Sequence, residues 1–323
     1  MISSLLETIS NIPFFATPAF GIIAMIIVGC SWCLIGFIMG DAPKRGIEPS
    51  VIQFFGFLIT CIFSISAMFI TGGLPDCSWK ITAITCTLLG IGGFMNFFML
   101  QIMSYAMQRG PNGIIWSIIQ SALVFPFIGG ILFFDVQLTW ARGIGIICLL
   151  AALVLFAMTK DNSNSGNNWK LPALICLVIA AIQQNLSTMP SYFQEAREVN
   201  SIVRTLATAI GGLSAAIIYE MTKMNKARLE KFYSNIKNPL LWRYVFALQF
   251  FNLVFAYTLL YPGMNAMADA GLGGMSYPMM VGSCIVSFSI TAALLLKEKF
   301  TLLQLGALVI CICGLIMICL PAA

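Results

Sequence analysis

The sequence predicts an all-α, polytopic membrane protein with ten transmembrane helices in two inverted five-helix repeats. Hydrophobic residues make up 59% of its 323 residues and charged residues 9%, and its mean hydropathy is +0.94. A soluble domain carries about 25% charged residues, so most of the exterior must face lipid. Ten stretches lack Asp, Glu, Lys and Arg. They indicate helices, because lipid requires backbone N–H and C=O groups to pair within the segment.

The uncharged stretches give the expected helices in order, and most reach the roughly 17–25 residues that a helix needs to cross a bilayer. The seventh is short, and we expect it to extend back to Ser201, with Arg204 snorkelling toward the interface. Residues 1–18 lack the basic start of a signal peptide and predict a short interfacial helix. The ten stretches are 19–40, 49–75, 81–108, 110–134, 143–159, 171–194, 205–219, 244–268, 270–296 and 300–323.

The 17 Lys and Arg residues predict the orientation. The odd-numbered connections between the stretches hold 13 of them and the even-numbered connections hold 4. Cytoplasmic loops carry an excess of Lys and Arg. We therefore expect the odd-numbered connections in the cytoplasm and both termini outside it, in a bacterial inner (plasma) membrane. The same rule explains the net charge of +5, so we expect no nucleic-acid partner.

Two polar segments organise the chain. A turn-rich linker at 161–169 divides it into a first half, 1–160, and a second half, 170–323. The insert at 221–243 has helical character and net positive charge. We expect it to form an interfacial helix on anionic lipid headgroups. Binding of a partner protein is the alternative.

The two halves carry similar motifs. A glycine turn at 110–113 precedes the fourth stretch, and a second one at 271–274 precedes the ninth. Three residues beyond each turn lies an aromatic residue, Trp116 in the first half and Tyr277 in the second. A repeat of five helices is odd-numbered, so its second copy inserts upside down. Inverted repeats are typical of alternating-access carriers, whose solute site lies near the midplane.

A short motif precedes the last stretch. Residues 296–306 read Leu-Lys-Glu-Lys-Phe-Thr-Leu-Leu-Gln-Leu-Gly, an acidic turn followed by Thr301, Gln304 and Gly306. This motif resembles that of the drug/metabolite transporter superfamily, in particular its EamA-like ten-helix members. The first-half copy, 135–143, is a looser match. The long seventh connection and the uncharged tails are also similar to the rhamnose-transporter branch.

The resemblance implies a ten-helix basket. Helices three, four, eight and nine are expected to line its central cavity. Helices one and six, and two and seven, are expected to move as gates, with five and ten at the periphery. Members of the superfamily move amino acids, sugars, nucleotide sugars, organic phosphates and drugs, so the resemblance does not select one solute.

The interior of the predicted bundle is uncharged, since no acidic or basic residue lies deep in any stretch. Intramembrane charges usually mark proton relays or ion sites, and phosphate carriers need Lys or Arg in the cavity. A neutral or zwitterionic solute fits best. Proton coupling through a carboxylate at a cavity mouth, such as Glu195, Glu198 or Glu220, stays open.

The 11 cysteines do not predict a metal or redox site. Cys30 and Cys33 form a CxxC pair and Cys311 and Cys313 a CxC pair, but the chain has no His to complete a metal site. Small apolar packing is the simpler role for these thiols. We therefore expect no metal and no cofactor. No nucleophile lies in helical register with a base, so we do not expect an enzyme.

Uncharged polar and aromatic residues are the candidate solute ligands. A carboxamide offers two donors and two acceptor sites for hydroxyls or for the polar ends of an amino acid, and Trp and Tyr stack on the apolar face of a sugar. For each residue the alternative is to bridge or pack helices. In the run 183–185, at most two side chains can face one cavity. The candidates are Asn96, Trp116, Gln120, Gln184, Gln249, Asn252, Tyr277 and Ser283.

These observations predict a secondary transporter that moves a small neutral or zwitterionic metabolite by alternating access. Two alternatives remain. One is a monosaccharide–proton symporter of the rhamnose type, which needs a titratable group on the solute path. The other is a non-transporting membrane protein that binds lipid or a partner through 221–243. We expect a monomer or a weak homo-oligomer.

Overall fold

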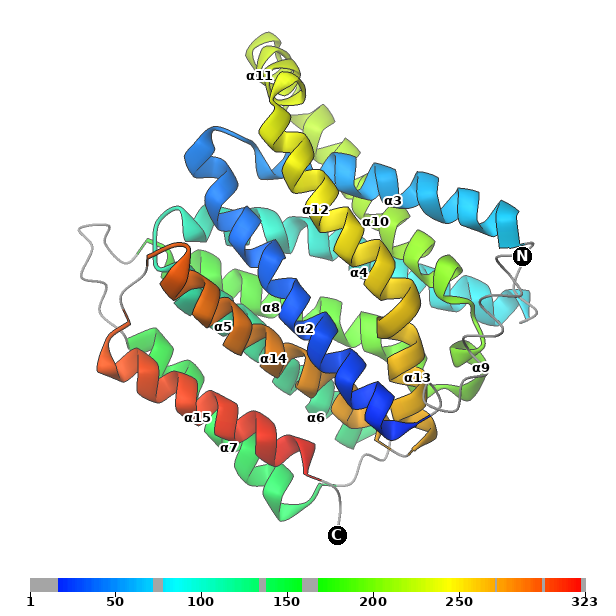
Figure 1. The fold of residues 1–323 in the computed structure, drawn as a ribbon, viewed down its shortest axis with the longest axis vertical. Coiled ribbons are helices and arrows are strands. Elements are labelled where there is room, and N and C mark those ends of the chain that lie inside the picture. The colour runs from blue at the N-terminus through cyan, green and yellow to red at the C-terminus, as the bar shows by residue number, and fades with distance from the viewer. Residues whose placement is uncertain are drawn as a thin grey trace.

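The computed structural model describes residues 17–71, 78–133, 138–158, 168–270, 272–297 and 300–320. Within these ranges all regular secondary structure is helical, which confirms the all-α class (Figure 1). Most of the N-terminal segment and of the linker, for which we predicted an interfacial helix and a turn-rich run, lies outside the described residues. Seven of the long helices are α2 (Pro18–Asp41), α3 (Pro49–Thr71), α4 (Trp79–Met107), α8 (Lys170–Thr188), α10 (Ser201–Thr222), α12 (Pro239–Phe255) and α14 (Gly273–Leu294).

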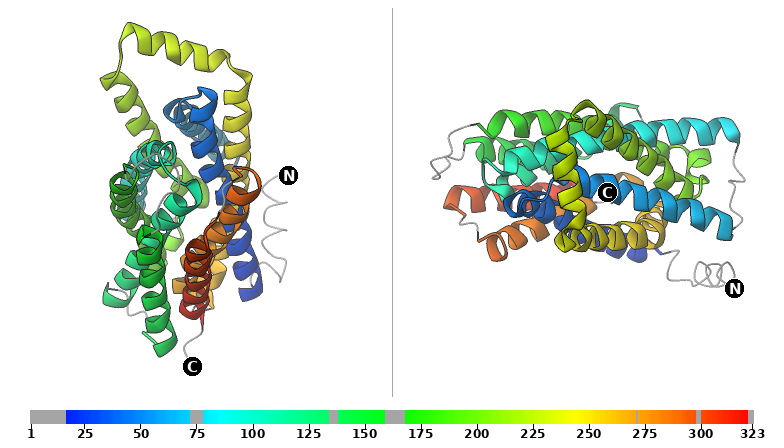
Figure 2. Two further views of the ribbon diagram at one scale, coloured as in Figure 1. Left: turned by 90° about the vertical axis from the view of Figure 1, so that its left-hand side faces the viewer. Right: turned by 90° about the horizontal axis from the view of Figure 1, so that it is seen from above.

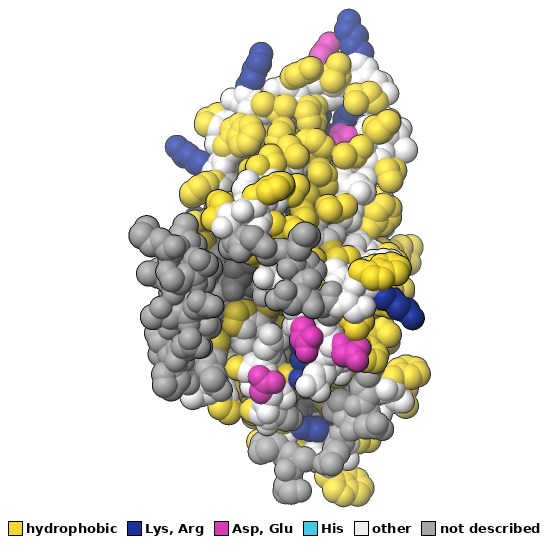
Figure 3. Space-filling view, turned by 90° about the vertical axis from the view of Figure 1, so that its right-hand side faces the viewer, with side chains coloured by type: hydrophobic (Ala, Val, Ile, Leu, Met, Phe, Trp, Pro, Cys, Tyr) yellow, Lys and Arg dark blue, Asp and Glu magenta, His cyan; other side chains and the backbone are white. Residues whose placement is uncertain are grey.

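Eight helical stretches in the described part of the chain are long and apolar enough to cross a membrane. Two shorter apolar stretches, 140–152 and 302–317, belong to α7 (Trp140–Met158) and α15 (Leu302–Cys319). Large hydrophobic side chains such as Phe69 and Leu294 stand exposed on the outside. In Figure 3 such side chains cover much of the upper half of the face, and Lys and Arg side chains project at its top. The protein is therefore an integral membrane protein.

Two of the long apolar stretches are broken near a proline. The stretch 112–133 divides into α5 (Asn112–Gln120), η3 (Ser121–Leu123) and α6 (Val124–Phe133), with Pro126 just after the break. In the stretch 239–269, a π-helical turn, η5 (Ala256–Leu260), separates α12 from α13 (Tyr261–Asp269), and Pro262 follows it. Because proline cannot donate to the carbonyl four residues earlier, the α-helical pattern is interrupted just before each one.

Helices that are far apart in the sequence pack closely. α2 packs against α14, α4 against α8 and α10, and α3 against α10, while α7 and α15 lie side by side at one edge of the bundle (Figure 1). Glycines bring two of these pairs into backbone contact. A Cβ added to Gly29 would lie 2.0 Å from the carbonyl oxygen of Met280, and one added to Gly211 would lie 1.8 Å from that of Gly90. Small residues allow this close approach of membrane helices.

The insert helix α11 (Lys226–Lys237) marks one end of the bundle, which we call the α11 end. It crosses that end between α10 and α12 (Figure 2). The backbone N–H of Glu48, between α2 and α3, donates to the side-chain oxygen of Asn235 in α11 at 2.9 Å. The hydroxyl of Ser104 in α4 donates to the carbonyl oxygen of Met39 in α2 at 2.7 Å. The predicted helical character of the insert is confirmed, whereas its contact with lipid stays a prediction.

The short helix α9 (Gln194–Arg197) lies at the opposite end of the bundle, which we call the α9 end. α10 begins at Ser201, as the sequence predicted. Arg204 differs from expectation, because only 2% of it is exposed and its guanidinium donates to the carbonyl oxygen of Ala196 in α9. The guanidinium carbon also lies 5.5 Å from the ring centroid of Tyr261. The Arg204 guanidinium thus contacts a carbonyl group and an aromatic ring of the protein, whereas snorkelling would have placed it among lipid headgroups.

Candidate functional site

A central cavity of about 260 Å³ lies among α2, α3, α4, α5, α8, α10, α14 and the broken segment 239–269. Seven of the eight candidate residues line it. They come from five different helices, so the fold brings together positions up to 181 residues apart, from Asn96 to Tyr277. The seven are Asn96, Trp116, Gln120, Gln184, Gln249, Asn252 and Tyr277.

Ser283 does not line the cavity. Its hydroxyl donates to the carbonyl oxygen of Met279, four residues earlier in α14, at 2.9 Å. A serine in a helix commonly forms this bond to its own backbone. Ser283 therefore follows the packing alternative that the sequence left open.

Gln249 is held in place across the cavity. Its side-chain oxygen accepts a hydrogen bond from the hydroxyl of Thr60 in α3 at 2.6 Å. Gly56 makes room for its amide nitrogen, since a Cβ added to Gly56 would lie 2.5 Å from that atom. α3 thus fixes the position of the Gln249 side chain through its oxygen. The bond from Thr60 leaves both N–H donors of the Gln249 amide unoccupied.

The side-chain amides of Gln120 in α5 and Gln184 in α8 form fewer hydrogen bonds than that of Gln249. The amide nitrogen of Gln120 donates only weakly, to the sulfur of Cys284 at 3.4 Å, because sulfur is a poor acceptor. Gln184 is 3% exposed, and its side-chain oxygen has no hydrogen-bond partner among the described residues. Gln183 donates to the hydroxyl of Ser187 at 3.2 Å. Asn185 turns away and donates to the carbonyl oxygen of Ala181, so two of the three adjacent amides line the cavity.

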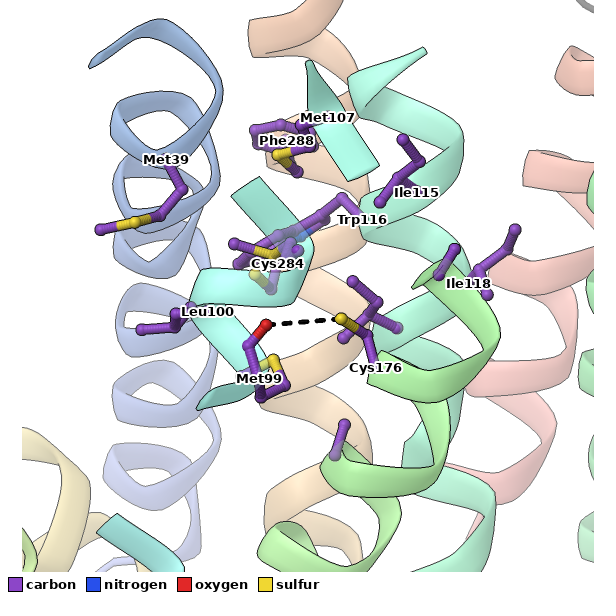
Figure 4. Close-up of a cluster of buried hydrophobic side chains, with 14 of the residues drawn as sticks. Met39, Met99, Leu100, Met107, Ile115, Trp116, Ile118, Cys176, Cys284 and Phe288 are labelled. Carbon is purple, nitrogen blue, oxygen red and sulfur yellow. Dashed lines mark hydrogen bonds between the residues drawn. The ribbon is translucent and has the colours of Figure 1, made fainter. Parts of the chain in front are cut away.

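Aromatic residues form part of the wall. Trp32 and Tyr277 meet edge to face, with ring centroids 6.2 Å apart. Trp116 packs against Phe288 with centroids 5.0 Å apart, within the buried cluster that Figure 4 draws. Trp116 is only 3% exposed, so it shapes the cavity, whereas the more exposed pair Trp32 and Tyr277 is better placed to stack on a solute.

The sequence did not single out several residues that line the cavity. Thr205 and Thr208 are three residues apart on one face of α10, so their spacing was a signal that could have been used. Thr60 and Trp32 are isolated within apolar stretches, and spacing alone does not distinguish them. The polar residues missed are Ser31, Thr60, Thr205, Thr208 and Tyr261. Gln183 belongs to the run 183–185 that the sequence had indicated, and Trp32 was expected to pack in the core or at the interface.

The central cavity carries no charge, because no Asp, Glu, Lys or Arg is among the described residues that line it. The buried charged residues lie at the helix ends instead. Asp41, at the end of α2, accepts hydrogen bonds from Tyr244 and from Arg45, each at 2.5 Å. Arg142 and Arg204 lie near the starts of α7 and α10, and Glu220 lies near the end of α10. The predicted absence of charge from the middle of the bundle therefore holds for the part of the chain that is described.

A second cavity, of about 640 Å³, opens at the α11 end and is charged. We call it the α11-end cavity. Arg228 forms an ion pair with Glu220 at 2.6 Å, contacts Glu48 and donates to the hydroxyl of Ser50. Lys231 forms a further ion pair with Glu48 at 2.6 Å. These contacts connect α11 to α10 and to the start of α3.

Comparisons with known proteins establish a shared fold and no family. No family model matches the chain, and no curated protein matches it. Among solved structures, 28 chains match. One of them, described only as "Crystal structure of protein", has a TM-score of 0.58 and 14% sequence identity, and the match covers 91% of this chain and 95% of that one. At this identity the likeness concerns the arrangement of the helices, which extends over nearly the whole of both chains.

The CxxC and CxC pairs, whose thiols could be metal ligands, lie on α2 and α15. Among the residues that the structure describes, no group of three or more His, Cys, Asp or Glu side chains could hold a metal ion. Cys30 and Cys33 are free thiols on α2, and Cys311 and Cys313 are free thiols on α15. The described lining of the central cavity consists of hydrogen-bonding and apolar side chains.

Proposed function

We propose that this protein is a secondary carrier that moves a small neutral or zwitterionic metabolite across the membrane by alternating access. The observation that carries the proposal is the chemistry of the central cavity. Its described lining combines six carboxamides with hydroxyl and aromatic groups and has no charged side chain. The six carboxamides belong to Asn96, Gln120, Gln183, Gln184, Gln249 and Asn252.

This lining favours an uncharged polar solute for an energetic reason. A net charge moved from water into an enclosed site without a counter-charge loses its solvation and gains no ion pair. Carboxamides and hydroxyls can both donate and accept hydrogen bonds, so they can replace the water around the hydroxyls of a sugar. Drug-sized ligands occupy cavities of roughly 300–1,000 Å³. A cavity of about 260 Å³ therefore suits a solute smaller than a typical drug.

The helix contacts support two inverted repeats and ten crossings. Three contacts join elements that would be equivalent in the two repeats: α3 with α10, α5 with α14, and α7 with α15. The other major contacts form related pairs, since α4 packs on α8 and α10 just as the segment 239–269 packs on α2 and α3. This pattern is expected of a pseudo-twofold arrangement with the solute site between the halves. It agrees with the helix arrangement of a drug/metabolite transporter basket. The excess of Lys and Arg on the odd-numbered connections, one of which contains α11, supports a cytoplasmic α11 end.

Proton coupling through a carboxylate in the central cavity is not part of this proposal. Glu220 is held by Arg228 near the α11 end, and Glu195 and Glu198 are exposed near the α9 end. None of these three carboxylates lines the central cavity. We therefore expect transport to be driven by the solute gradient or by an ion that binds elsewhere.

A thermal-shift screen tests the proposal. Purified full-length protein is heated with single sugars, amino acids, nucleosides and organic anions, since a bound solute stabilises the folded state by mass action. We expect a neutral or zwitterionic compound to raise the melting temperature in the wild type and to lose this effect in Gln249→Leu. Stabilisation by organic anions alone would contradict the proposal.

A further inference from the structure

An aromatic cluster has members in the linings of both cavities. Phe97 in α4 is fully buried, and its ring centroid lies 5.3 Å from that of Phe98 and 5.5 Å from that of Tyr219. Phe98 and Tyr219 line the α11-end cavity. Phe57 in α3 belongs to the same cluster, but it lines the central cavity and packs onto Gly212 of α10. We call this cluster the Phe57–Phe97 barrier.

One face of α3 runs from one cavity to the other. Ser50 lines the α11-end cavity, and Phe57 and Thr60 line the central cavity. Gln53 lies between them, and spacings of three and four residues place all four on one side of the helix. The distance from Ser50 to Phe57 along the helix axis is roughly 10 Å, so Gln53 occupies a short gap.

Gln53 is the exceptional residue on this face. It is 5% exposed, and neither its side-chain oxygen nor its amide nitrogen has a hydrogen-bond partner in the part of the chain that is described. Burying an unpaired amide is costly, and an apolar residue of similar size would avoid that cost. Packing therefore does not account for a glutamine at this position. A polar partner that reaches the Gln53 amide only in another conformation would account for the glutamine.

We propose that Gln53 is a transit site, at which the side-chain amide hydrogen-bonds the solute as it passes from the central cavity to the α11-end cavity. The inference rests on the proposed carrier function and adds a step to it. In the present structure the aromatic rings of the Phe57–Phe97 barrier are packed together, and the Gln53 amide has no hydrogen-bond partner among the described residues. When the barrier parts, the amide offers the passing solute the same donors and acceptor as the carboxamides of the central cavity. The solute class is the same, a small neutral or zwitterionic metabolite.

Cysteine labelling tests the location without requiring a known solute. Gln53→Cys and Ile52→Cys are compared in full-length protein reconstituted in liposomes and treated with a membrane-impermeant methanethiosulfonate. Ile52 is the matched control, because it is the next residue on α3, is fully buried and belongs to the apolar core. Peptide mass spectrometry reads each thiol separately, so the native buried Cys61 on α3 serves as an internal reference.

We expect position 53 to be modified at least tenfold faster than position 52, because the transit site becomes hydrated whenever the barrier parts. Equal rates at both positions would overturn the proposal. If the protein carries solute while both positions stay unlabelled, the transit role fails and the carrier function stands. If position 53 is labelled in a protein that carries no solute, the carrier function fails and the transit role fails with it.

A second variant separates transit from a structural role. Gln53→Leu removes the amide and puts an apolar side chain of similar size in its place. We expect its melting temperature to equal or exceed that of the wild type, with solute flux reduced at least fivefold and binding in the central cavity unchanged. Gln53→Asn, which keeps an amide, should recover part of the flux. A lower melting temperature for Gln53→Leu with wild-type flux would assign Gln53 to structure and overturn the proposal.

Discussion

The central cavity and the α11-end cavity are built from some of the same helices but differ in chemistry. α3, α4 and α10 contribute to both linings. The central cavity is smaller and, in its described lining, uncharged, whereas the α11-end cavity is larger and includes Glu48, Lys223, Arg228 and Lys231. This difference in charge depends on how deep each cavity lies in the bundle. The α11-end cavity lies at helix ends, where water and lipid headgroups lower the energetic cost of a charged side chain.

The comparison suggests a division of labour. Neutral hydrogen-bonding groups in the middle can select a solute without having to compensate a buried charge. Ion pairs at the α11 end instead connect α11 with α10 and the start of α3. Both cavities are lined by residues of α4 and α10, and we call the contact between these two helices the shared wall. Substitutions that force the shared wall apart should therefore destroy the fold. Those at the α11 end should affect stability, and those in the central cavity should affect solute binding.

Gly211→Val should have the largest effect, because it separates the shared wall. A Cβ at this position would lie 1.8 Å from the carbonyl oxygen of Gly90, and neither backbone can move aside. We expect loss of folded protein, measured as loss of the monodisperse peak in size-exclusion chromatography. The control is Gly306→Val, because a Cβ at Gly306 meets nothing within 4 Å. A wild-type elution profile for Gly211→Val would show that the α4–α10 contact is looser than described.

Arg228→Met should have the next largest effect. The side chains of Arg228, Glu48 and Glu220 are 15%, 14% and 9% exposed. Removing the guanidinium leaves the largely buried carboxylate of Glu220 without its ion-pair partner and leaves Glu48 paired with Lys231 alone. We therefore expect a loss of about 3 kcal/mol in the free energy of unfolding. Equilibrium denaturation measures it, and solute binding in the central cavity should be unchanged.

The matched control for Arg228 is Lys231→Met, which removes an ion pair whose ammonium is 57% exposed. An exposed pair contributes only about 0–1 kcal/mol. Equal losses for the two variants would contradict the distinction between a buried and an exposed cation in the α11-end cavity. A large loss of solute binding in Arg228→Met would contradict the division of labour itself.

Gln249→Leu should lower solute affinity about tenfold, which corresponds to about 1.4 kcal/mol. The variant removes a carboxamide that lines the central cavity, while the hydroxyl of Thr60 keeps a second acceptor, the carbonyl oxygen of Gly56, at 3.0 Å. Stability should therefore fall by about 1 kcal/mol or less. Solute-induced thermal shift measures the affinity. Gln194→Leu, on an exposed residue of α9, is the control and should change neither quantity.

Ser283→Ala should have the smallest effect. The hydroxyl bonds only to its own helix and lies outside the central cavity, so stability should change by less than about 0.5 kcal/mol and solute affinity should stay constant. A clear loss of affinity in the same thermal-shift assay would mean that Ser283 reaches the solute in another conformation of α14.

The sequence could predict the helices because uncharged stretches of membrane-spanning length have one common explanation. It could also predict five of the carboxamides that line the central cavity, because amides in membrane-spanning segments are rare and must find partners. It could not predict Thr60 as the partner of Gln249, since that pair is 189 residues apart and depends on how α3 meets α12. The burial of Arg204 was missed for a similar reason. Its hydrogen-bond acceptor is a carbonyl oxygen of α9, and no pattern in the sequence predicted that helix.

Solute counterflow in liposomes tests the central claim most directly. Full-length wild-type protein and Gln249→Leu are reconstituted in parallel. Exchange is then followed with radiolabelled forms of the compounds that raise the melting temperature most. We predict saturable exchange of a neutral or zwitterionic solute by the wild type and strongly reduced exchange by Gln249→Leu. The claim would be contradicted if the wild type moved no sugar, amino acid or nucleoside under any imposed gradient.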